Sequence, residues 1–93
     1  MTVSRILGGI GGVLGVPREW IYSGGIAAGF TRLQIAATQG WMDDVRKFVA
    51  EGDDINSINR KNHTALDDAI NGGHTAIRDY LISVGAKRAR ELQ

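Results

Sequence analysis

The sequence contains no cysteine among its 93 residues. This absence excludes disulfide bonds, thiolate nucleophiles and zinc sites built on cysteine, and it suits a reducing compartment such as the cytoplasm. The chain also lacks an excess of either charge, because 11 Lys and Arg residues stand against 10 Asp and Glu, for a formal net charge of +1. Such a balance gives no bulk attraction to nucleic acid or to an anionic membrane. We therefore expect one small cytoplasmic domain that is held together by packing and does not bind nucleic acid.

Side chains suited to catalysis or metal binding are few. The chain has two histidines, His63 and His74, and none of its four serines lies in a nucleophile-elbow sequence. Asp67 or Asp68 could offer carboxylate ligands to a metal. We interpret this pair instead as solvent-exposed acids of the kind that helix starts favour through the helix dipole. The sequence thus predicts no enzyme, no metal site and no cofactor.

Long apolar runs are missing as well. The longest is ILGGIGGVLGV, residues 6–16, which contains five glycines. It is shorter than the roughly 20 residues that a membrane-spanning helix needs, and no small-x-small signal cleavage site follows it promptly. Gly9, Gly11 and Gly15 are spaced as in a dinucleotide-binding turn, but no hydrophobic strand precedes them. We expect neither a membrane span nor a nucleotide loop here.

An internal repeat with an offset of 33 residues occupies the rest of the chain. The matched pairs are Thr31 and Thr64, Leu33 and Leu66, Ala36 and Ala69, Gly40 and Gly73, Phe48 and Leu81, Val49 and Ile82, and Gly52 and Gly85. Each unit predicts two short antiparallel helices: a threonine caps the first, a glycine ends it, and a second amphipathic helix runs to the next glycine. Because neither pair could bury its apolar face alone, we expect the two pairs to stack.

These residues resemble the ankyrin repeat family, whose consensus combines a T-P-L-H-x-A-A helix start, a Gly-His turn, a leucine-rich second helix and a G-A-D-V-N loop. The matching segments, within residues 31–86, are TRLQIAA, GW, FVAEGDDIN, HTALDDAI, GGH and YLISVGA. The resemblance implies an all-α fold, a short solenoid of stacked antiparallel helix pairs with β-turn loops. The consensus proline is replaced by Arg32 and Ala65, and the histidine by Gln34 and Asp67, so the helix-opening hydrogen bonds must be made differently.

Two segments flank or complete the repeats. Residues 31–93 comprise the two repeats and a short polar C-terminal cap, in which the basic cluster at residues 87–90 either contacts an acidic partner or is simply solvated.

Residues 1–30 form a Gly-rich apolar N-terminal segment. An offset of 28 places Trp20 on Phe48 and Gly24 on Gly52, which would make this segment a degenerate repeat. A non-helical cover and a self-association segment are the alternatives, the latter because Gly8 and Gly12 form a small-xxx-small pair.

The resemblance implies a non-enzymatic function, an adaptor or inhibitor that binds a partner protein through its turn tips and first helices. The positions so implicated are Phe30, Arg32, Trp41, Arg60, Asn62, His63, Ala65 and His74. Trp41 has an equally weighted structural interpretation, in which it packs on Trp20 or on the N-terminal cap. The alternative function is a self-assembling structural protein, whose apolar residues 6–16 mediate homo-oligomerisation or membrane association.

Overall fold

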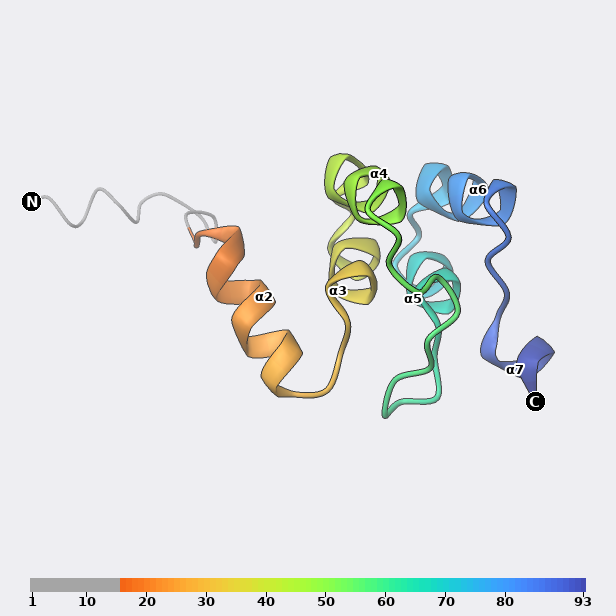
Figure 1. Ribbon diagram of the computed structural model, residues 1–93, viewed down its shortest axis with the longest axis horizontal. Helices are drawn as coiled ribbons and strands as arrows, with labels where there is room; N and C mark the ends of the chain where they lie inside the picture. Colours follow the sequence, from red (N-terminus) through yellow and green to blue (C-terminus); the bar gives the residue numbers. More distant parts are fainter. Residues whose placement is uncertain (1–15) are drawn as a thin grey trace, which may run out of the picture.

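In the computed structural model, which describes residues 16–93, the chain forms a small all-α domain without any strand in that range (Figure 1). The helices, in order, are α2 (Arg18–Ala27), α3 (Arg32–Gln39), α4 (Met42–Ala50), α5 (Ala65–Asn71), α6 (Thr75–Ser83) and α7 (Ala89–Leu92). None of these helices combines the length and the apolar character that crossing a membrane requires.

Four of the helices form two pairs. Helix α3 packs against α4 and α5 packs against α6, while α3 also contacts α5, so the two pairs lie side by side (Figure 1). Each pair turns at a glycine with positive φ, Gly40 at 84° and Gly73 at 74°. Glycine adopts this left-handed conformation without the steric cost that a Cβ would add. The helix ends that the sequence predicts at these glycines are therefore confirmed.

The backbone hydrogen bonds repeat with the predicted offset of 33 residues. At the first turn, the N–H of Trp41 donates to the carbonyl of Ala36, and that of His74 donates to the carbonyl of Ala69. The same agreement holds after the second helix of each pair, where Asp53 donates to Phe48 and Ala86 donates to Leu81. The repeat in the sequence is thus a repeat in the backbone.

The hydrophobic core lies between these helices. Its buried side chains include one leucine from each first helix, Leu33 and Leu66, and Val45, Ile77 and Leu81 from the second helices. Burying a side chain of this size stabilises a fold by about 1.5–3 kcal/mol relative to leaving it exposed. Ala36 and Ala69 are fully buried as well, and their small side chains allow the helices to approach closely.

Both first helices begin with a capping box. The hydroxyl of Thr31 accepts a hydrogen bond from the N–H of Gln34 at 3.1 Å, while the Gln34 side chain accepts one from the N–H of Thr31 at 3.0 Å. Thr64 and Asp67 make the same reciprocal pair. A cap of this kind contributes about 1 kcal/mol. The residues that stand where the ankyrin consensus has histidine thus make the helix-opening hydrogen bonds.

Helix α2 packs across one end of the first pair. The ring of Tyr22 lies edge-on against Trp41 and Phe48, with centroids 5.5 and 5.6 Å away. The guanidinium of Arg18 lies 4.3 Å from the Trp41 ring centroid and 3.1 Å from a carboxylate oxygen of Asp43. This helix therefore covers an apolar face that the first pair would otherwise expose.

The correspondence between residues 18–25 and the second helix of the first repeat is wrong. Trp20 is 67% exposed, whereas its assigned counterpart Phe48 is 6% exposed. Helix α2 also continues through Gly24, and the glycine of positive φ that follows it is Gly29. Residues 1–15, which include all but the last residue of the apolar run at residues 6–16, lie outside the described residues, and so does the role in self-association that is predicted for that run.

The basic C-terminal cluster is partly built into the fold, which corrects the expectation of a solvated tail. Arg88 Nε donates to Oδ1 of Asp67 at 2.7 Å, and the N–H of Ala89 donates to Oδ2 at 2.8 Å. Asp67 is 4% exposed, so its expected position in solvent is also wrong. Although burial opposes ionisation, these hydrogen bonds and one from the N–H of Thr64 lower the pKa of Asp67 to about 2.

Candidate functional site

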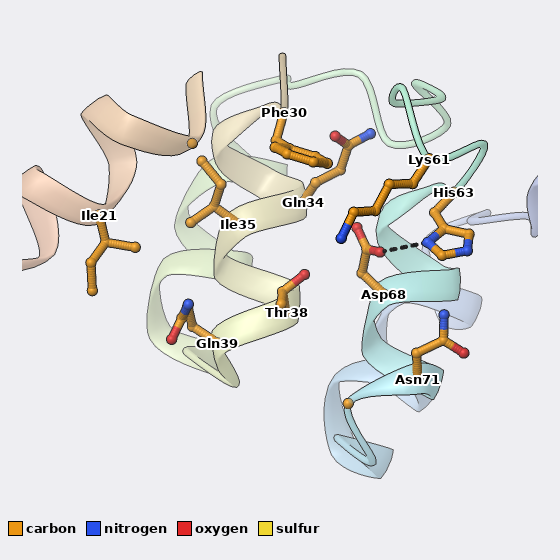
Figure 2. Close-up of a pocket in the computed structure, with 12 residues that line it drawn as sticks. Ile21, Phe30, Gln34, Ile35, Thr38, Gln39, Lys61, His63, Asp68 and Asn71 are labelled. Atoms are coloured by element: carbon orange, nitrogen blue, oxygen red, sulfur yellow. Dashed lines mark ion pairs between the residues drawn. The ribbon is translucent and has the colours of Figure 1, made fainter. Parts of the chain in front are cut away.

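A groove of about 410 Å³ runs along helices α3 and α5 (Figure 2). Its apolar side consists of Ile21 and Gly25 from α2, Phe30 from the segment before α3, and Ile35 from α3. Small-molecule sites in proteins are commonly concave regions of this size with a largely apolar lining and a few placed polar groups. This groove is the candidate binding site.

The opposite side of the groove is polar. Lys61 and His63 approach it from the loop ahead of α5, while Asp68 and Asn71 project from α5 itself (Figure 2). The remaining polar lining comes from Gln34, Thr38 and Gln39 of α3 and from Gly72. The groove therefore has one face suited to apolar side chains and one suited to hydrogen bonds and charge.

The 33-residue offset relates the two sides of the groove. The equivalent positions that both line it are Phe30 and His63, Ile35 and Asp68, Thr38 and Asn71, and Gln39 and Gly72. The same surface of each helix pair thus contributes to one site. Its chemistry is not repeated, because the first pair contributes the apolar residues Phe30 and Ile35 where the second contributes His63 and Asp68.

A tight turn ahead of α5 positions Lys61 and His63. The buried Asn59 side chain accepts hydrogen bonds through Oδ1 from the N–H of Lys61 at 2.9 Å and of His63 at 3.2 Å. Asn62 closes the turn with a φ of 63° and donates its N–H to the carbonyl of Asn59 at 2.8 Å. Asparagine tolerates this left-handed conformation better than most residues. The local sequence thereby fixes two charged or polar side chains at the groove edge.

Asp68 is the carboxylate of the site. Its side chain is only 11% exposed, and Oδ1 lies 3.4 Å from Nδ1 of His63. Burial raises the pKa of Asp68 to about 6, against the opposing attraction of His63. Lys61 reaches toward the apolar side, where its ammonium lies 5.9 Å from the centroid of the Phe30 ring, at the outer limit of a cation–π contact.

Of the residues predicted to bind a partner, Phe30 and His63 lie in the groove. Arg60 and Asn62 lie on the adjacent turn, and both are exposed. Their side chains have partners within the domain: Arg60 donates to the carbonyl of Ala28 at 2.9 Å, and Gln93 donates to Oδ1 of Asn62 at 2.7 Å. The buried Ala65 belongs to the core instead.

The other three predicted residues lie elsewhere and connect helices. Arg32 pairs with Asp53 at 2.7 Å and with Glu51 at 2.8 Å. His74 Nε2 lies 3.0 Å from the carbonyl oxygen of Thr38, which links the two pairs. Trp41 packs under α2 against Tyr22 and Arg18, not against Trp20. This packing favours the structural interpretation of Trp41.

Sequence reasoning missed most of the groove. The positions it did not select are Ile21, Gly25, Gln34, Ile35, Thr38, Gln39, Lys61, Asp68, Asn71 and Gly72. A helical spacing of three and four residues from Ile35 would have selected Thr38 and Gln39, and the 33-residue offset would then have given Asp68 and Asn71. Nothing comparable identifies Ile21, because its place depends on how α2 packs against α3.

Among residues 16–93, no group of three or more His, Cys, Asp or Glu side chains is arranged to hold a metal ion. Comparisons of the whole chain with known protein families, with curated proteins and with solved structures gave no match. The lining and the charge of the groove are therefore the features that indicate a function.

Proposed function

We propose that this chain is a short ankyrin-like solenoid that binds a segment of a partner protein in the groove between α3 and α5, as a non-enzymatic adaptor or inhibitor. One observation carries the proposal: equivalent positions of both helix pairs line a single groove, Ile35 and Thr38 on α3 and their counterparts Asp68 and Asn71 on α5. In a repeat architecture, such a surface extends along the stack and is available for recognition.

The dimensions and chemistry of the groove suit a short segment of polypeptide. A volume of about 410 Å³ accommodates a few side chains rather than a folded domain. The apolar face gains from burial at about 25 cal/mol per Å². The side-chain oxygens of Thr38, Asp68 and Asn71 can accept hydrogen bonds from peptide N–H groups, so the partner's backbone polar groups need not remain unsatisfied.

The proposal is tested by selecting peptides from a random library on the immobilised full chain. Enriched peptides are then measured by fluorescence anisotropy against two matched variants. Thr38→Arg places a long side chain in the groove from an exposed position of α3, and Thr75→Arg makes the same exchange at an exposed position at the start of α6. We expect Thr38→Arg to weaken binding at least tenfold and Thr75→Arg to leave it unchanged. Equal binding by both variants, or no enriched peptide, would refute the groove as the binding site.

A further inference from the structure

Two consecutive aspartates in the first turn of α5 have opposite environments. Asp67 accepts short hydrogen bonds from Arg88 Nε at 2.7 Å, from the N–H of Ala89 at 2.8 Å and from the N–H of Thr64 at 3.0 Å. The side-chain contacts that Asp68 makes within residues 16–93 are both 3.4 Å long, one to His63 Nδ1 and one to Nδ2 of Asn59. An ionised carboxylate can accept about four hydrogen bonds. Asp68 therefore keeps acceptor capacity that the domain does not use.

The unused capacity faces the groove. Figure 2 shows the Asp68 carboxylate directed into the space between α3 and α5, with the His63 ring on one side of it and the ammonium of Lys61 on the other. The fold itself does not require a charge at this position, because the equivalent residue of the first helix pair is the buried Ile35. A carboxylate that is almost buried and weakly hydrogen-bonded is unfavourable in the free protein, and a ligand that supplies a positive donor would relieve that cost.

The charged groups around Asp68 leave room for such a donor. Lys61 is exposed on the turn, and its positive charge favours the ionised form of Asp68, but its ammonium makes no direct ion pair with that carboxylate among the described residues. Asp67, the neighbouring acid, is held by Arg88 outside the groove. The residues Ile35 and Thr38, through which α3 lines the groove, carry no charge.

We propose that the groove binds a lysine or arginine side chain of the partner segment, with Asp68 holding the cationic head and Ile35 and Phe30 packing against the aliphatic stem. The assignment rests on the proposed function and adds the chemical class of the ligand. A long basic side chain is itself apolar along its stem and charged at its tip. It therefore matches a groove that is apolar on one face and bears a carboxylate on the other. A guanidinium can also donate two parallel hydrogen bonds to one carboxylate.

The probes for this proposal are two capped tripeptides of nearly the same shape, acetyl-Gly-Arg-Gly-amide and acetyl-Gly-citrulline-Gly-amide, in which a neutral ureido group replaces the charged guanidinium. Each is titrated into the full chain at pH 7, and binding is followed by the NMR shifts of backbone amides. We expect the arginine peptide to shift the amides of residues 35–38 and 61–71, and to bind at least tenfold more tightly than the citrulline peptide. Asp68→Asn should remove this preference, whereas Asp79→Asn, at an exposed position of α6, should retain it.

Two outcomes overturn the inference. The first is equal or absent binding of the two tripeptides by the unmodified chain, a result that does not depend on whether any variant folds. The second is an unchanged preference for arginine in an Asp68→Asn variant whose urea midpoint has not fallen. The proposed function is judged separately: library peptides that lose binding in Thr38→Arg but carry no basic residue would uphold the groove and reject the role of Asp68.

Discussion

Replacing Asp68 by asparagine should stabilise the domain at neutral pH, although nearly every contact is retained. The pKa of Asp68 is about 6 in the folded protein, against an ordinary value of 3.8. Each unit of difference corresponds to about 1.4 kcal/mol, so keeping this carboxyl ionised costs the folded state about 3 kcal/mol at most. Because the amide must also be accommodated, we expect a net gain of about 1–2 kcal/mol at pH 7.

The stabilisation expected for Asp68→Asn should change with pH in a definite direction. The folded state binds the Asp68 proton more tightly than the unfolded state, so the stability from this group is complete below pH 3.8 and is lost as the pH rises through about 6. The advantage of Asp68→Asn should therefore be small at pH 4 and fully developed at pH 7. Urea unfolding of both proteins, followed by circular dichroism at the two pH values, measures it. Equal midpoints at pH 7, or a gain that is the same at both pH values, would refute the reasoning.

Two further predictions concern neighbouring features of the fold. Asp67→Asn should destabilise the domain by about 2 kcal/mol at pH 7, because the pKa of Asp67 is lowered to about 2; the loss should shrink as the pH falls from 4 towards 2 in the same urea series. Gly40→Ala should cost more than Gly52→Ala. Both positions have positive φ, which costs an alanine about 1–2 kcal/mol, but a Cβ at position 40 would also lie 2.6 Å from Cε1 of His74, whereas position 52 is open. Thermal melting compares the two variants, and equal losses would show that the His74 contact has no energetic weight.

Much of the helix arrangement could be predicted from the sequence, because the same local signals mark the helix starts and turns of both helix pairs. Threonine at each helix start and glycine at each turn carry their own conformational preferences, and the 33-residue offset repeats them. The same rule failed at Gly24 and Gly25, where glycine would be expected to end a helix. A Cβ at position 25 would lie 2.4 Å from Cδ1 of Ile35, so the glycine there allows α2 to approach α3 closely. Tertiary packing, which the pattern does not encode, decides this case.

The candidate site was less predictable than the fold. Phe30 and His63 could be placed in it through the resemblance to ankyrin repeats. Asp67 and Asp68 are indistinguishable by residue type and by position in the first turn of α5, yet their pKa values are shifted in opposite directions. The difference arises because the N–H of Ala89 and the guanidinium of Arg88, some 20 residues away, donate hydrogen bonds to Asp67 alone, whereas burial dominates at Asp68. Contacts of that separation follow from the folded structure alone.

The docking of the last helical turn has an electrostatic consequence for the groove. Asp67 raises the pKa of Asp68 through its negative charge, and Arg88 is the cation that pairs with Asp67. The last helical turn thus holds an ionised Asp67 beside Asp68, although it does not itself line the groove. Because a neighbouring negative charge disfavours a second one, this docking adds to the raised proton affinity of Asp68, whose main cause is burial.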